Sequence, residues 1–293
     1  MVRAATGRRE GGSNGYAQPV SFCREVLTQF EMKVRVGDDR YGDRNRRPTR
    51  PQARTFGPGR ERNAASRNGS DDDRKGPPIP REIEAKQLAP EIRRELSTLD
   101  RVNADAVARH LVAAGELLDE DPEAALSHAR AARARSGRIA AVREAVGIAA
   151  YQCGDWAQAI AELRAARRMG SKSPLLPLIA DCERGLGRPE RALELARGDE
   201  AVKLTGDEAD EMRIVVAGAR ADLGQLEQAL TVLSTPQLDP SRIGTIPARL
   251  FYSYAETLLA LDRRGEALQW FLHAAEADVE GATDAEDRVS ELG

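Results

Sequence analysis

Residues 143–169 read REAVGIAAYQCGDWAQAIAELRAARRM, and this stretch carries the fold assignment. On both sides of Gly154 its apolar residues recur every three or four positions, which is the spacing of amphipathic helices. Asp155 follows the glycine and belongs to a residue type that commonly caps the N-terminus of a helix. The stretch therefore predicts two helices joined by a tight turn at Gly154.

Four further segments align with this one on an alanine of the second helix. The five anchor alanines are separated by 34, 33, 37 and 38 residues. A small residue stands twelve positions before each anchor, and three units have a glycine five positions before it. A small residue midway along the first helix lets the anchor alanine of the second helix approach it, and glycine permits the tight turn. The residues assigned to this packing signature are Ala125, Gly147, Ala159, Ala192, Ala229 and Ala267.

This pattern resembles the tetratricopeptide repeat (TPR), a family of stacked antiparallel helix pairs. The resemblance covers roughly residues 104–278, in five units, although most units lack the usual aromatic near the start of the first helix. No sustained alternating pattern of a β-strand occurs after residue 81. The expected fold is therefore all-α, a helical-hairpin solenoid of about five TPR-like repeats, and a related helical-hairpin solenoid is the structural alternative.

Composition divides the chain into four expected parts. Residues 1–80 carry 17 basic and 10 acidic side chains with many Gly and Pro, so we expect a disordered basic arm. Residues 81–293 carry 27 basic and 37 acidic side chains. We divide them into a linker and capping helix (81–103), the solenoid (104–278) and an acidic C-terminal tail (279–293). The composition changes at Met32, which leaves two interpretations: a heterogeneous tail, or a translation start at Met32 or elsewhere downstream of Met1.

Several classes of function are disfavoured by the sequence. The three cysteines form no C-x-x-C motif, and no His/Cys cluster suggests zinc. No window approaches 18 consecutive apolar residues, and the N-terminus lacks the apolar segment of a secretory signal. Neither a phosphate-binding glycine loop nor a catalytic triad is identifiable. We expect a cytoplasmic, non-enzymatic protein without cofactor, metal or membrane contact. Arg outnumbers Lys 39 to 5, which we associate with a GC-rich bacterial genome of the actinobacterial type.

The TPR resemblance implies a groove lined by the first helix of each pair. Counting back from the anchors predicts the lining residues His110, Glu144, Tyr151, Asp181, Arg184, Tyr252 and Glu256. TPR proteins that hold the C-terminal carboxylate of chaperones use a clamp of Lys, Arg and Asn at these positions. Arg184 is the only cation among the predicted lining residues, so binding of a chaperone tail is disfavoured. The somewhat acidic groove predicts a scaffold that binds another protein or peptide, with a basic, amphipathic segment preferred.

The Arg-rich arm offers an alternative partner. Arginines interleaved with Tyr41 and Phe56 suit nucleic-acid phosphates and unpaired bases. The residues predicted to make such contacts are Arg44, Arg46, Arg47, Arg50 and Arg54. A solubilising tail is another interpretation. A third is a mask, in which the arm, with a charge of about +7, covers the groove of the body, with a charge of about −10.

Overall fold

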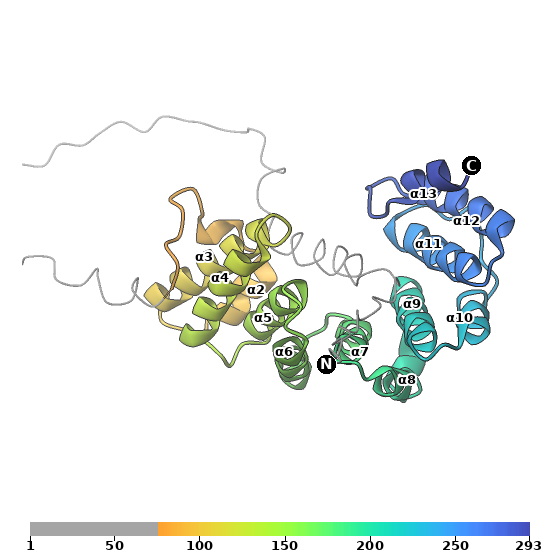
Figure 1. Ribbon diagram of the computed structural model, residues 1–293. Helices are drawn as coiled ribbons and strands as arrows, with labels where there is room; N and C mark the ends of the chain where they lie inside the picture. The colour runs from red at the N-terminus through yellow and green to blue at the C-terminus, as the bar shows by residue number, and fades with distance from the viewer. Residues whose placement is uncertain (1–75) are drawn as a thin grey trace, which may run out of the picture. The chain divides into compact units, whose positions relative to one another are not determined.

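The computed structural model describes residues 76–293, and this range is helical without any β-strand (Figure 1). The predicted disordered arm, including the five arginines from Arg44 to Arg54, lies outside the described residues. Within residues 76–293, none of the helices combines the length and apolar character needed to cross a membrane. The chain divides into two compact units, whose described residues are 76–175 and 176–293.

The N-terminal unit consists of a short first helix and two helical hairpins. Its helices are α2 (Pro90–Leu96), α3 (Arg101–Leu117), α4 (Pro122–Arg135), α5 (Ala140–Gln152) and α6 (Trp156–Arg168). Three of them start at aspartates whose side chains accept a hydrogen bond from a backbone amide of the first turn, at 3.0–3.1 Å. These caps are Asp100, Asp121 and Asp155. Local cap chemistry therefore sets where the helices begin.

A segment before α2 packs on the first hairpin. Ile83 and Leu88 are buried, and Arg109 of α3 donates from Nε to the Ile83 carbonyl at 2.9 Å. At Gly76 an added Cβ would lie 2.6 Å from the Cβ of Ala131 on α4, so this glycine allows a close approach. Contact with the hairpin thus begins before residue 80, where the composition suggested the arm would end.

The C-terminal unit continues the hairpin series. Its helices are α7 (Leu175–Gly185), α8 (Pro189–Ala196), α9 (Asp207–Asp222), α10 (Leu226–Leu233), α11 (Thr245–Ala260), α12 (Arg264–Ala277) and α13 (Ala285–Leu292), with α7 starting at the junction of the units. The longer repeat spacings are explained by two connections, one before α9 with a 3-10 turn at Ala201–Lys203, and one between α10 and α11. The all-helical, repeated-hairpin prediction is confirmed.

The last described segment is a helix where the sequence suggested an acidic tail. α13 packs on α12, and its Ala285 is buried while Val289 and Leu292 contact the core around Phe271. These apolar residues recur at four- and three-residue spacing, so the helix covers the end of the last hairpin. The acidic composition concealed this amphipathic pattern.

Candidate partner-binding surfaces

Four of the five hairpins turn with the same backbone form. The residue five positions before the anchor has a positive φ, of 71° at Gly154, 70° at Gly187, 71° at Gly224 and 60° at Asp262. The amide of the next residue donates to the carbonyl five positions earlier at 2.8–3.0 Å in all four. This geometry caps the C-terminus of the first helix. In the fifth hairpin an aspartate adopts the conformation for which the sequence suggested only glycines.

The packing between helices repeats as well. All five anchor alanines are completely buried. Gly147 accommodates Leu163, because an added Cβ would lie 2.6 Å from the Leu163 Cγ, whereas Ala159 had been expected as its neighbour. Within the units the second helix of one hairpin packs on the first helix of the next, as α4 does on α5, α8 on α9 and α10 on α11. These are TPR-like hairpins.

Comparison with solved structures finds similar chains. The TPR-like chain is similar to a solved structure described as "YrrB: a TPR protein with an unusual peptide-binding site", with a TM-score of 0.39 and 22% identity over 64% of this chain and 94% of that one. None of the protein-family models matches this sequence, and neither does any curated protein. At that distance the similarity transfers no binding residue to this TPR-like chain.

The first predicted groove residue, His110, lies between the two helices of the first TPR-like hairpin. Its Nδ1 is 3.0 Å from Nδ1 of His128 on α4, and both imidazoles are buried. One Nδ1 must donate and the other must accept, so one ring carries its proton on Nδ1 and the other has none there. Burial lowers the pKa of His128. Residues 76–293 contain no group of three or more His, Cys, Asp or Glu that could hold a metal ion.

Glu144 and Tyr151 of α5 were also predicted to line the groove, and both are buried. The Glu144 carboxylate accepts hydrogen bonds from the hydroxyls of Ser171 at 2.8 Å and Ser173 at 2.6 Å. The Tyr151 ring stands edge-on to Trp156, with 5.0 Å between the ring centroids. These contacts give both residues a packing role within the fold, and their assignment to a partner groove stays a prediction.

In the C-terminal unit, the predicted groove residues Asp181 and Arg184 belong to an ion pair between first helices. The Arg184 guanidinium donates to Asp181 at 2.6 Å and to both carboxylate oxygens of Asp222 on α9 at 2.8 and 3.3 Å. It lies against Gly218, where an added Cβ would be 2.5 Å from Cζ. Arg184 thus connects α7 to α9 and is not presented to solvent as an isolated cation.

The same arrangement continues along the next first helices. Arg249 of α11 forms a buried ion pair with Glu211 of α9. Arg288 of α13 donates to Glu256 of α11 from Nε at 2.9 Å and from Nη2 at 2.7 Å. Tyr252, one turn before Glu256, is half-buried, and burial raises the pKa of its phenol. The predicted groove positions at Tyr252 and Glu256 are therefore partly covered by α13.

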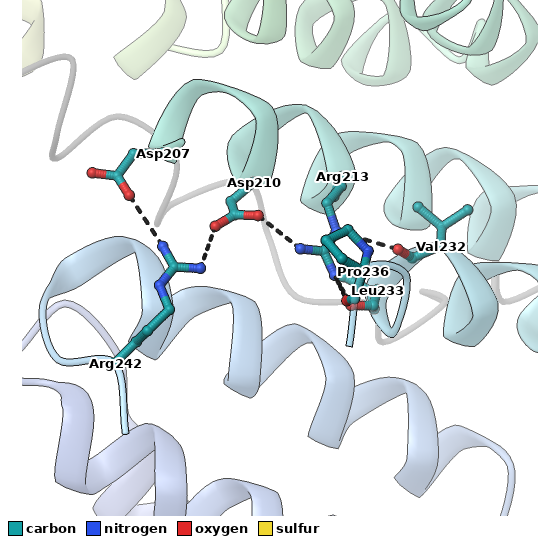
Figure 2. Close-up of polar contacts among 7 residues, drawn as sticks. All are labelled: Asp207, Asp210, Arg213, Val232, Leu233, Pro236 and Arg242. Carbon is teal, nitrogen blue, oxygen red and sulfur yellow. Dashed lines mark hydrogen bonds and ion pairs between the residues drawn. The ribbon is translucent and has the colours of Figure 1, made fainter. Parts of the chain in front are cut away.

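Sequence reasoning missed a clamp that fixes the long connection between α10 and α11. The Arg213 side chain on α9 donates to the Asp210 carboxylate at 2.7 Å, and Asp210 also accepts from Arg242 at 2.6 Å. The Arg242 guanidinium reaches Asp207 at 3.2 Å (Figure 2). The remaining donors of Arg213 reach the carbonyls of Val232, Leu233 and Pro236. The clamp satisfies the C-terminal carbonyls of α10, which a helix leaves unpaired.

Charge is distributed unevenly between the units. Residues 76–175 carry 15 basic and 14 acidic side chains, whereas residues 176–293 carry 12 basic and 23 acidic ones. The C-terminal unit therefore has a formal charge of −11 and accounts for the acidity of the body. Among its exposed carboxylates, Asp207 and Glu208 lie in the first turn of α9.

Proposed function

We propose that this protein is a non-enzymatic interaction scaffold whose C-terminal unit binds a basic, amphipathic peptide or partner helix. The observation that carries the proposal is the concentration of negative charge on a unit whose first helices, α9 and α11, pack side by side. Complementary charge speeds encounter and excludes acidic competitors. The half-buried Ile214 and Tyr252 on these helices supply apolar contact area beside the charges.

The contact residues differ from those that the repeat register suggested. Asp181, Asp222 and Glu256 already hold arginines, so we assign ligand attraction to the exposed Glu208 in the first turn of α9. Reversing the buried Glu144 and Asp181 to lysine would bury a charge without a partner and confuse binding with folding.

The test measures binding of a labelled helical peptide, with Lys and Arg on one face and Leu on the other, to the full-length chain. The variant Glu208→Lys should weaken binding about threefold, because its carboxylate lies on the first helix α9. The control Glu227→Lys makes the same charge change at an exposed position of the second helix α10 and should leave the affinity nearly unchanged. Equal weakening by both variants would show that net charge, and not this face, attracts the peptide.

The Arg-rich arm remains the alternative partner region. If the arm masks the acidic unit, removing residues 1–75 should raise the affinity for the external peptide, because an intramolecular competitor is lost. Unchanged affinity would leave the arm as a spacer or as a separate binding element.

A further inference from the structure

The near-neutral charge of the N-terminal unit conceals two regions of opposite sign. Segments 133–143 and 162–172 carry eight Arg and Lys residues and one acidic residue, Glu162. Residues 110–129, around the turn between α3 and α4, carry five acidic residues and no Arg or Lys. The basic segments comprise the end of α4, the connection into α5, the last turns of α6 and the connection after it.

The two basic segments meet in space at Glu162. Its buried carboxylate is 2.9 Å from Nε of Arg133, at the end of α4, and 2.8 Å from Nη1 of Arg143, in the first turn of α5. The end of α4, the start of α5 and the end of α6 therefore lie together. We refer to the surface formed by segments 133–143 and 162–172 as the basic edge.

The acidic residues around the basic edge are engaged inside the fold. Glu162 holds two arginines, Glu144 accepts from two serine hydroxyls, and Glu95 of α2 accepts from the Ala141 amide at 3.4 Å. By contrast, three basic residues in or next to the two connections are exposed, namely Arg138, Arg168 and Lys172. The basic edge therefore presents a surplus of positive charge to solvent.

Helix stability explains only part of this distribution. Cations favour the C-terminus of a helix, so Arg168 at the end of α6 has a local role. Arg138 lies two residues before α5 begins, where the helix dipole disfavours positive charge, and Lys172 lies beyond α6 in the following connection. Their charges suggest a ligand outside the fold.

The arm joins the fold beside this edge. The close approach of Gly76 to Ala131 places the entry of the chain on α4, two residues before the basic edge begins at Arg133. Arg74 and Lys75 immediately precede Gly76, and residues 1–80 carry a charge of about +7. The described chain therefore begins on the helix whose end belongs to the basic edge.

We propose that the basic edge binds the phosphate backbone of single-stranded nucleic acid, with Arg138, Arg168 and Lys172 contacting phosphates. Guanidinium groups suit phosphate because they donate two parallel hydrogen bonds. A protein partner is less well matched, because Met169 is the one exposed large apolar side chain in segments 133–143 and 162–172, and stable protein interfaces need buried anchors. Contacts to phosphate alone predict binding without sequence preference. This surface is distinct from the acidic face of the C-terminal unit.

The test uses full-length protein with labelled oligouridylate and oligothymidylate, and measures affinity between about 50 and 200 mM salt. In the triple variant Arg138→Gln/Arg168→Gln/Lys172→Gln, the slope of log affinity against log salt should become shallower by about 2, because each phosphate contact to a single strand contributes about 0.7. The control Arg197→Gln/Lys203→Gln/Arg264→Gln removes the same charge from exposed positions of the C-terminal unit and should leave the slope unchanged. Circular dichroism checks that both variants remain helical.

Each outcome decides for or against the basic edge. Loss of slope with both oligonucleotides supports phosphate recognition, and loss with oligouridylate alone adds a role for the ribose hydroxyl. The proposal is overturned if the wild-type chain does not bind either oligonucleotide at low salt. It is also overturned if the triple variant binds like the wild type, whereas neutralising Arg44, Arg46, Arg47 and Arg50 abolishes binding. If the triple variant instead abolishes self-association seen by sedimentation, the edge binds the acidic unit of a second copy and the nucleic-acid proposal is wrong.

Discussion

Replacing Gly147 by alanine should lower the free energy of unfolding of the N-terminal unit by about 1 kcal/mol. The new Cβ would lie 2.6 Å from Cγ and 3.2 Å from the backbone nitrogen of Leu163, whereas carbon atoms pack best at about 3.5–4.0 Å. Because Leu163 is completely buried, it cannot swing into solvent, and overpacking of this kind costs about 1–3 kcal/mol. Alanine recovers up to about 1 kcal/mol through its higher helix propensity.

Gly265 provides the matched control for this substitution. It also lies within a helix, α12, but an added Cβ would meet no atom within 4 Å. Gly265→Ala should therefore be neutral or stabilising by up to about 1 kcal/mol. Combining Gly147→Ala with Leu163→Ala should cost less than the sum of the single changes, since the smaller side chain relieves the overlap.

The assay is urea unfolding followed by tryptophan fluorescence. Trp156, in the same hairpin, reports Gly147→Ala in a Trp270→Phe background, and Trp270 of α12 reports the control Gly265→Ala in a Trp156→Phe background. Each unit needs its own probe because two units need not unfold in one transition. A Gly147→Ala chain as stable as the wild type would refute the close helix contact, and additivity with Leu163→Ala would refute the assigned neighbour.

Four further outcomes are expected. Burial lowers the pKa of His128 from 6.5, so near that pH the unfolded chain binds more protons than the folded chain. The free energy of unfolding should therefore be full above pH 6.5 and fall below it. Urea midpoints of the wild type and of His110→Asn/His128→Asn, measured across this range, should show whether the histidine pair causes the loss. Arg213→Ala should lower the melting temperature, through a loss of about 2–3 kcal/mol, because partly buried carbonyls lose their donor, and Arg213→Lys should recover only part of it. Asp262→Gly should raise the free energy of unfolding in urea by about 0.5 kcal/mol by relieving a left-handed conformation, whereas Asp262→Val should lower it. Limited trypsin digestion, followed by mass spectrometry, should remove the arm and leave a fragment beginning near Arg81; a resistant N-terminal fragment would contradict the prediction of disorder.

The helices and their order could be predicted from the sequence because they depend on local chemistry. Asp155 caps α6 through its own side chain, and Gly154 adopts a positive φ that few other residues accept. The turn at Asp262 was harder to predict, because aspartate is equally common as an N-cap. The helix α13 had a usable signal in its apolar spacing, which the acidic composition obscured.

Counting from the anchor alanines could not predict which first-helix side chains are available to a partner. The register assigned Arg184 to the groove, yet its carboxylate partner, Asp222, stands 38 residues later on the neighbouring first helix. Arg249 and Glu211 are separated by 38 residues as well. An arginine and a carboxylate one repeat apart were therefore a readable signal, but pairing also depends on which rotamers the packed helices permit.

Sequence alone determined the repeated hairpins and the uneven charge of the chain, since helix propensity, caps, turn glycines and formal charge act through neighbouring residues or none. Tertiary packing determined which charged residues remain exposed. It buried Glu144 and Asp181, joined Arg213 to the end of α10, and brought two distant Arg-rich segments together at Glu162. Such contacts depend on distances between helices, which the sequence does not state. Because burying an unpaired charge costs several kcal/mol, buried charged side chains lie beside partners on neighbouring elements.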